Sequence, residues 1–449
     1  MTSTMTKERV LLLARLCLVG FFVNCQPSEP YLTKYLVDNK GISKEVVDDV
    51  LWPIDSLALA LALIPAGILA ELIGYRKVIF GGLLFREATR LILLFGEGVP
   101  LMATTQGTYA AAIAAHTVYF AYAYRAVPPD LYVSATGAMH AAYHFGNVIG
   151  ALLGQACMSW ITTDMVVLFY MSFFFTTLGL LSFVFLFPHP VRGRHRTALL
   201  LAENADEDPP TLEESPTLLS LWRERGGVRG TLRLLADVYA SSSFTVAAWS
   251  AWWVLAYGAH TILSDYYQTA FYSRDKDGNF GFLEACMEVG RSVGALTPAL
   301  IASCCTRSLT ASSHVVMIVL GCIFAGAGNL LSLSVASNAG AYLLTVVGVY
   351  IFGLQYATAC AAIASSLTCN FYAVVFTMNT FASLILSAVL LRIGSAVHTS
   401  LEGYYWISSG QQFCCAAVIL AALAVRMRGA RPASADMING GFASGVLPG

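Results

Sequence analysis

Apolar residues fall into long runs that short polar segments separate. A helix that crosses the hydrocarbon core of a membrane needs about 20 apolar residues, and several of these runs reach that length even though they carry charges. The pattern predicts an all-α membrane protein with about twelve transmembrane helices. The runs are 10–36, 51–73, 78–96, 100–124, 131–158, 165–187, 236–271, 279–303, 312–336, 340–367, 371–397 and 404–427.

One polar segment, between the sixth and seventh runs, is much longer than the others. It contains R-G-R-H-R, A-E-N-A-D-E-D-P-P and E-E-S-P, a composition typical of a linker. The sequence therefore predicts two six-helix halves, a linker between them and a C-terminal tail. Their residues are 1–187 for the first half, 188–233 for the linker, 234–427 for the second half and 428–449 for the tail.

Basic residues predict the orientation. With the N-terminus inside, the segments on the cytoplasmic side hold 16 lysines and arginines, whereas the segments on the other side hold 5. This asymmetry follows the positive-inside rule and places both termini and the linker in the cytoplasm.

Composition and charge narrow the class of function. Apolar residues make up 57% of the 449 positions and charged residues 12%, about half the charged fraction of a soluble globular chain. A net charge of −1 gives no field that favours nucleic acid, and the eleven cysteines show no metal-ligand spacing. We therefore expect the lipid bilayer as a partner, and neither a nucleic acid, a cofactor nor a metal. No nucleophile–base cluster indicates an enzyme, and the external loops are short for a receptor.

The end of the first run carries an acid between two prolines. The segment Q-P-S-E-P-Y-L-T-K-Y-L interrupts the helix at Pro27 and Pro30 and places Glu29 between them. Burying a carboxylate costs several kcal/mol or more, so charged residues at such depth commonly mark a substrate route. The alternative is a helix cap at the membrane surface.

The eighth run carries three charged residues, Glu284, Glu288 and Arg291, at i, i+4 and i+7. This spacing places them on one helical face, which cannot face lipid. If Glu288 and Arg291 form a structural pair, Glu284 remains the free carboxylate, and we favour it as a pathway residue.

Five further residues are candidates for the lining of a substrate site. Asp55, at the start of the second run, is a solvated helix start or an acid in the pathway, and His116 and Tyr119 lie among small alanines in the fourth run. His140 and His144 are spaced i, i+4 in the fifth run, where a polar cavity wall is favoured over a zinc site because no further ligands accompany them.

Two other charged or aromatic groups have plainer explanations. Arg86 and Arg90 flank Glu87 in the third run, which suggests a partly neutralised network. The seventh run, W-S-A-W-W-V-L-A-Y-G-A-H-T-I-L-S-D-Y-Y-Q, mixes aromatics with polar groups toward its outer end. An aromatic belt at the membrane interface explains some of it and leaves Asp265 ambiguous.

Two six-helix halves with a cytoplasmic linker resemble the layout of the major facilitator superfamily. A local motif, Gly67-I-L-A-Glu71-L-I-Gly74-Tyr75-Arg76-Lys77, is similar to the superfamily's G-x-L-a-D-r-x-G-r-k loop, with Glu71 in place of the usual aspartate. The resemblance implies halves that rock around a site near the membrane midplane.

Three segments resemble the reduced folate carrier and thiamine transporter family of that superfamily. Q-P-S-E-P-Y-L-T-K-Y-L is similar to R-P-x-E-x-F-L-x-P-Y-L, W-S-A-W-W to W-S-x-W-W, and I-A-S-S-L with F-Y-A-V-V-F-T-M-N-T-F to the family's eleventh-helix opening. The resemblance covers most of the chain and implies a carrier, not an enzyme, whose partner is a small-molecule vitamin and whose location is the plasma membrane.

The same resemblance bears on the substrate. The thiamine branch is expected to use acids and an aromatic residue that match Glu29, Glu284 and Tyr119, whereas His116 and Asp55 replace a glutamate and a tryptophan. The folate branch is expected to carry arginines in the fourth, fifth and tenth helices and a lysine in the eleventh. This chain has His116 in the fourth helix, His140 in the fifth, no charge in the tenth and Ser387 in the eleventh. The cationic cage for a folate dicarboxylate is therefore mostly missing. Thiamine is the favoured substrate and reduced folate the alternative, since protonated histidines or Arg291 would also serve an anion.

Overall fold

The N-terminal helices follow the predicted apolar runs closely. The computed structural model describes residues 7–43, 46–188, 244–274, 280–304, 311–367, 372–396 and 401–429. Up to residue 188 the elements are α1 (Lys7–Asn24), η1 (Glu29–Tyr31), α2 (Leu32–Asp38), η2 (Val47–Leu51), α4 (Trp52–Ile73), α5 (Tyr75–Phe95), α6 (Gly98–Ala126), η3 (Pro129–Leu131), α7 (Tyr132–Trp160) and α8 (Val166–Leu186).

The C-terminal helices continue the pattern after the polar segment. They are α12 (Phe244–Trp252), η4 (Trp253–Tyr257), α13 (Gly258–Arg274), α14 (Phe280–Cys304), α15 (Ala311–Ser334), α16 (Asn338–Ser366), α17 (Tyr372–Ala396) and α18 (Leu401–Gly429). Helical structure therefore occurs in each predicted run, and the described residues contain no strand. Nearly all of the predicted linker 188–233 and of the tail 428–449 lies outside the described residues.

Six of the described helical segments are long and apolar enough to cross a membrane. They are Lys7–Tyr31, Val166–Leu186, Ser312–Ser334, Asn338–Ser366, Tyr372–Gly394 and Glu402–Met427. The remaining predicted spans include α5 and α7, which are helical over 21 and 29 residues but carry charged or polar side chains at buried positions.

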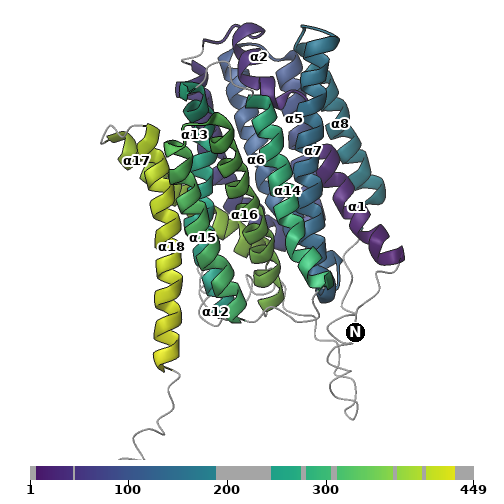
Figure 1. Cartoon of the computed structure of the whole chain (residues 1–449). Helices are drawn as coiled ribbons and strands as arrows, with labels where there is room; N and C mark the ends of the chain where they lie inside the picture. Colours follow the sequence, from purple (N-terminus) through teal and green to yellow (C-terminus); the bar gives the residue numbers. More distant parts are fainter. Residues whose placement is uncertain are drawn as a thin grey trace, which may run out of the picture.

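The helices stand side by side as a bundle (Figure 1), with α2 near one end and the start of α12 near the other. We call these ends the α2 end and the Gly74 end, the latter named after the turn between α4 and α5. One hydrophobic core joins N-terminal and C-terminal helices, since Tyr75, Tyr124 and Tyr132 belong to the same buried cluster as Tyr372 and Phe376.

Two smaller cores each belong to one set of helices. One, around Tyr35, Leu93 and Phe169, contains residues of N-terminal elements alone, and the other, around Phe271 and Leu283, contains residues of C-terminal helices alone. Tyr35 lies in α2 and Phe271 near the end of α13, so both of these cores lie toward the α2 end. The large apolar core is thus shared between the two sets of helices, whereas the cores toward the α2 end are separate.

Close contacts hold the sets together at the Gly74 end. A methyl group placed on Gly67 of α4 would lie 2.1 Å from Thr377 Oγ1 of α17, so only glycine allows this approach. Nearby, the Ala373 backbone N–H donates to Tyr75 Oη at 3.0 Å. Glu71, the acid of the turn motif, accepts a hydrogen bond from Tyr75 and pairs with Arg125 at 2.7 Å.

Candidate functional site

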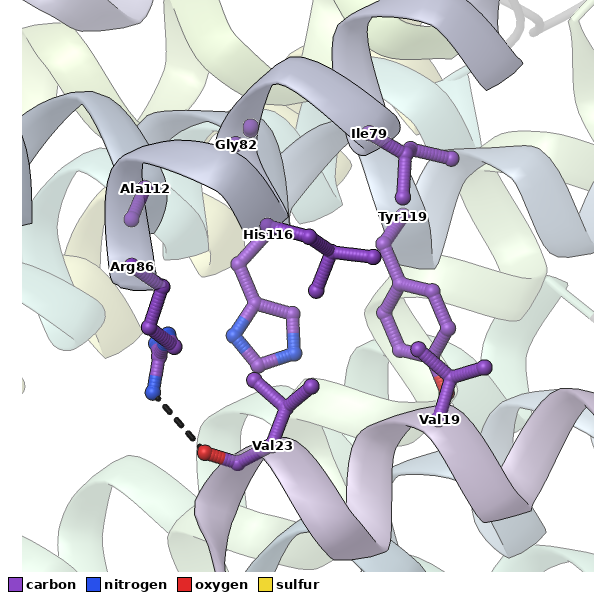
Figure 2. A pocket seen from close by; sticks show the side chains of 10 residues that line it. Val19, Val23, Ile79, Gly82, Arg86, Ala112, His116 and Tyr119 are labelled. Carbon is purple, nitrogen blue, oxygen red and sulfur yellow. Dashed lines mark hydrogen bonds between the residues drawn. The ribbon is translucent and has the colours of Figure 1, made fainter. Parts of the chain in front are cut away.

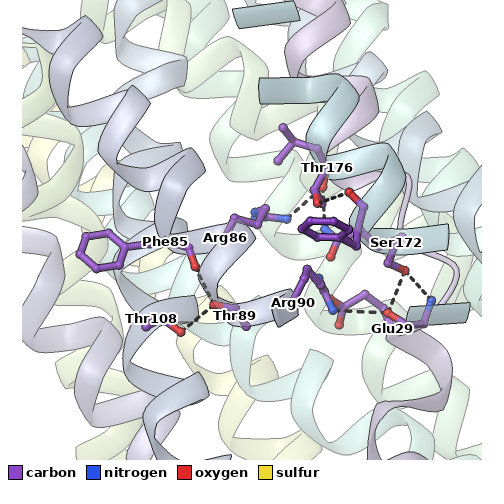
Figure 3. Close-up of polar contacts among 12 residues, drawn as sticks. Glu29, Phe85, Arg86, Thr89, Arg90, Thr108, Ser172 and Thr176 are labelled. Carbon is purple, nitrogen blue, oxygen red and sulfur yellow. Dashed lines mark hydrogen bonds and ion pairs between the residues drawn. The ribbon is translucent and has the colours of Figure 1, made fainter. Parts of the chain in front are cut away.

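The break after the first helix brings Glu29 against an arginine of α5. Helix α1 ends at Asn24, and Glu29 begins the short 3-10 helix η1 with Pro30 in its first turn. Arg90 Nη2 donates to Glu29 Oε1, and Arg90 Nη1 donates to Ser28 Oγ at 3.3 Å (Figure 3). The Arg90 side chain is 2% exposed and that of Glu29 35%, so Glu29 is a paired acid at the edge of the buried interior.

A stripe of glycines on α7 positions this break. Methyl groups on Gly146, Gly150 and Gly154 would lie about 2.5 Å from backbone atoms of Phe21, Gln26 and Pro27. Glycines at every fourth position let two helices approach within backbone contact, as in membrane helix pairs generally. The sequence shows this G-x-x-x-G-x-x-x-G signal, which our reading of the sequence did not use.

Arg86, Glu87 and Arg90 are buried together on α5, but no direct hydrogen bond is found among them. Arg86 Nη1 donates to the Val23 carbonyl at 3.1 Å, and its Nη2 is buried with no hydrogen-bond partner. Glu87 instead accepts from Thr177 of α8 at 3.2 Å. Both arginines interact electrostatically with Glu87, so the expected partial neutralisation in the interior is present, although each of the three side chains has its hydrogen-bond partners on other elements.

Asp55 lies in the first turn of α4, half-buried, and interacts electrostatically with Glu29. Its Oδ1 atom is buried and has no hydrogen-bond partner. An unsatisfied buried carboxylate oxygen needs explanation, because desolvating it without a partner is unfavourable. Asp55 is therefore the acid in this region with an oxygen left to bind a donor.

His116 and Tyr119 line a small pocket between α1, α5 and α6 (Figure 2). Val19, Val23, Ile79, Leu83, Ala112 and Arg86 contribute to its wall. The His116 ring lies 5.0 Å from that of Tyr143 and is nearly parallel to that of Phe120. Tyr119 is buried, and its hydroxyl donates to the Leu16 carbonyl at 2.7 Å, so this hydroxyl also links α6 to α1.

His140 and His144 have different surroundings although they lie one turn apart. The His140 ring stacks on Phe120 at 3.9 Å and meets Tyr356 of α16 at 4.8 Å, and its Nε2 is buried without a partner. His144 Nδ1 lies 2.7 Å from Glu288 Oε2 of α14. The two imidazoles therefore do not converge on one point.

Glu284 and Glu288 both have partners. Arg291 donates to Glu288 Oε1, as the sequence predicts, but Tyr267 of α13 donates to Glu284 Oε2, so Glu284 is not the free carboxylate that we expected. The reason is that α13 brings a tyrosine hydroxyl to this face of α14, a contact between segments 17 residues apart.

The tryptophans of the seventh run are not an interfacial belt. Trp249, Trp252 and Trp253 are fully buried, and Trp253 packs on Tyr356 and Phe376 at 4.9 and 5.3 Å. Trp253 begins the π-helix η4, a feature frequent at functional sites. These three residues are therefore not among those that a belt explains, and the side chain of Asp265 lies outside the described residues.

Known proteins resemble this chain over most of its length. Human thiamine transporter 2 is 26% identical over 415 residues, covering 84% of this chain and 82% of the relative. Folate transporter 1 of Caenorhabditis elegans is 26% identical over 407 residues, covering 88% of both. The human reduced folate transporter is 25% identical over 402 residues, covering 86% of this chain and 67% of the relative.

Two solved transporters share the fold. The Escherichia coli fucose:proton symporter FucP superposes with a TM-score of 0.60 at 15% identity, covering 91% of this chain and 98% of that one. The human organic anion transporter MFSD10 gives 0.54 at 14% identity, covering 91% and 97%. These likenesses show the major facilitator fold that the sequence predicts. A model of the family described as reduced folate carrier matches residues 8–402, and the chain therefore belongs to the reduced folate carrier family.

Proposed function

We propose that this chain is a secondary carrier that moves thiamine across a membrane by alternating access. Its family and its structural neighbours are transporters and not enzymes, and with several long apolar helices it is a multi-pass integral membrane protein. We propose a site bounded by the residues that the sequence singled out, namely Glu29, Asp55, His116, Tyr119, His140 and Glu284.

The distribution of cores supports alternating access. The two sets of helices share one core and are in close contact at the Gly74 end, whereas the cores toward the α2 end are separate. This arrangement suits a carrier of two rocking halves, 1–187 and 234–427, that is closed at one end. Because Arg76, Lys77 and Arg125 lie at the Gly74 end, we propose that this end is cytoplasmic and that twelve spans leave both termini and the linker 188–233 on the same side.

The observation that carries the choice of thiamine is the buried, unpartnered Asp55 Oδ1 near Glu29. A protonated aminopyrimidine would donate a hydrogen bond to this oxygen, and a thiazolium cation would offset the carboxylate charge, without displacing a protein group. The rings of His116, Tyr119 and Tyr143 lie together in the N-terminal helices, and Tyr143 interacts electrostatically with Glu29. These rings provide faces on which a flat ring or a cation packs favourably.

A reduced folate is the second candidate, and Arg86 is the observation that favours it. The guanidinium is buried and its Nη2 has no partner, which is unfavourable for a charged group unless an anion binds there. Relatives named as folate transporters resemble this chain about as well as those named as thiamine transporters.

The test is parallel uptake of labelled thiamine and a labelled reduced folate into cells that express the protein, each competed by the other. We expect thiamine uptake that folate does not inhibit, and we expect Asp55→Asn to reduce it at unchanged surface level. Asp130→Asn, a carboxylate 47% exposed and paired with Arg9, is the matched control. Uptake of folate alone would reject thiamine, and surface labelling of the same cells tests the plasma membrane as the location.

A further inference from the structure

Arg86 of α5 carries a buried charge whose hydrogen bonds are only partly made. The residue is 2% exposed, and its Nη1 donates to the Val23 carbonyl at 3.1 Å. Its Nη2 is buried and has no hydrogen-bond partner among the described residues. Because a buried donor on a charged group is unfavourable without an acceptor, this position favours a bound group that accepts a hydrogen bond.

The nearby carboxylates do not supply this acceptor. Glu29 and Glu87 both interact electrostatically with Arg86. Glu29 instead accepts a hydrogen bond from Arg90, and Glu87 accepts one from Thr177 of α8. These acids therefore offset part of the charge of Arg86 without reaching Nη2, which stays available to an anion.

Arg86 lines the small pocket between α1, α5 and α6 that also contains His116 and Tyr119 (Figure 2). The ten residues that line this pocket include no acid, and apart from these three side chains its wall is apolar. The Tyr119 hydroxyl donates to the Leu16 carbonyl, so its proton is already used. The guanidinium is a donor, and an imidazole carries at least one N–H. Donors set in an apolar wall without an acid favour an anion over a cation.

The size of the pocket limits what it can hold. The centre of a water-sized particle has about 20 Å³ in which to lie. A cavity needs roughly 10–15 Å³ of this kind to hold one water, so the pocket takes one small ion, and neither thiamine nor a folate fits inside it. A folate would have to bring a carboxylate to Arg86 from outside this space. Chloride, which is slightly larger than a water, matches both the size and the donors.

Three contacts fix the dimensions of the pocket. A methyl group on Gly82 of α5 would lie 2.2 Å from Ala115 Cβ of α6, so these two helices pack closely there. The Arg86 hydrogen bond joins α5 to α1, and the Tyr119 hydroxyl joins α6 to α1. All three helices belong to the N-terminal half, so a rocking motion between the halves leaves the pocket intact.

We propose that this pocket binds one chloride ion, which accepts a hydrogen bond from Arg86 Nη2, lies beside the His116 imidazole and neutralises the arginine next to the vitamin site. The role of the ion rests on the proposed transport of thiamine. Arg86 interacts electrostatically with Glu29, and Glu29 with Asp55, so the charge of the guanidinium is felt at the acids that would bind the thiamine cation. Arginine alone repels this cation, whereas the ion pair of arginine and chloride is neutral.

The first experiment measures anion binding without any vitamin. Thermal unfolding of the full chain in nanodiscs is followed in chloride, bromide, sulfate and gluconate at equal ionic strength. We expect the melting temperature of the wild type to rise and saturate with chloride or bromide, because a ligand that binds only the folded state stabilises it. The larger sulfate and gluconate should not have this effect. Arg86→Met should remove the rise, and the exposed Arg392→Met should keep it.

A second variant fills the pocket and keeps the arginine. Ala112→Val adds two methyl groups to the pocket wall and should abolish the effect of chloride (Figure 2). Ala111→Val is the matched control, because Ala111 is the preceding residue of α6 and does not line the pocket. A wild type that melts at the same temperature in chloride and in gluconate overturns the proposal, as does a chloride-specific rise that persists in Arg86→Met or Ala112→Val.

The second experiment asks whether the ion acts on thiamine. Counterflow of labelled thiamine is measured in proteoliposomes with either chloride or gluconate on both faces. A unit charge about 10 Å from a bound cation changes its binding by about tenfold where the effective dielectric constant is about 20. At low thiamine concentration we therefore expect wild-type exchange to fall by about tenfold in gluconate. Arg86→Met, which lacks both the charge and the ion, should exchange equally in the two salts.

The results separate this inference from the proposed function. Wild-type thiamine exchange that is equal in both salts overturns the role of the ion, even where the melting temperatures show that chloride binds. Absence of thiamine exchange in every salt overturns the proposed function, and the melting temperatures then decide the anion site alone.

Discussion

Replacing Gly67 by alanine tests how the two sets of helices are held at the Gly74 end. The new Cβ atom would lie 2.1 Å from Thr377 Oγ1, 3.1 Å from its Cβ and 3.2 Å from its Cγ2. Rotation of Thr377 does not remove the clash freely, since its hydroxyl donates to the Ala373 carbonyl at 2.8 Å and the β-branched side chain has few rotamers in a helix. The substitution therefore pushes α4 away from α17.

The magnitude follows from the cost of overpacking a close contact, which is about 1–3 kcal/mol. If the clash exists only where α4 meets α17, this energy acts on the equilibrium between conformations. A difference of about 1–3 kcal/mol changes the ratio of two states by about 5- to 150-fold. Gly67→Ala should therefore depopulate the conformation with the Gly74 end closed and slow uptake without preventing folding.

Hydrogen exchange in nanodiscs, read by mass spectrometry, provides the assay. We expect faster exchange in the first turns of α17, around Ala373 to Thr377, and partial recovery in the double variant Gly67→Ala/Thr377→Ala, where the clashing Oγ1 and Cγ2 atoms are absent. Gly81→Ala in α5 is the control, since no atom lies within 4 Å of its added methyl. Exchange and uptake equal to wild type in Gly67→Ala would show that the contact between α4 and α17 does not hold this end closed.

Two further variants test the acids of the site. Glu284→Gln retains a side chain of the same size but loses the charge that Tyr267 binds. Because a hydrogen bond to a charged group contributes about 1.5–3 kcal/mol, we expect uptake to fall by about 10- to 150-fold at normal surface expression. Unchanged uptake would give Glu284 a structural role. Arg90→Gln removes the buried partner of Glu29 and should lower the unfolding free energy by about 1–3 kcal/mol. We expect the low end of this range because Glu29 is partly exposed. Thermal unfolding of this variant beside the control Arg392→Gln measures the change.

The positions of the helices could be predicted from the sequence because each apolar run is long enough to be recognised without knowing what it packs against. The break after the first helix was also readable, since Pro27 and Pro30 remove backbone donors and prevent the helix from continuing. The contact between the two sets of helices at the Gly74 end could not be predicted from the sequence. It depends on Gly67 meeting Thr377 across more than 300 residues, and no local pattern specifies that partner.

The pairing of charges shows the same limit more sharply. Sequence spacing found the Glu288–Arg291 pair, which lies within one helix. It failed for Arg90, which pairs with Glu29 at 61 residues' separation, and for Glu288, which meets His144 at a separation of 144. Neighbouring charges in a helix were taken as partners, although residues i and i+1 do not face each other. Residue types therefore identified the site's members, whereas only packing decides which charges remain available.

The charges that remain available decide between the two substrates. Glu29 and Glu284 already have protein partners, so a cation bound there must displace a bond, whereas Asp55 Oδ1 and Arg86 Nη2 are buried without one. Thiamine thus depends most on Asp55 and a folate on Arg86. Arg86→Met should reduce folate uptake and spare thiamine uptake, with the exposed Arg392→Met as control. If Arg86→Met abolishes thiamine uptake while Asp55→Asn spares it, the buried arginine and not the acid serves the vitamin, and the assignment of the binding residue must be reversed.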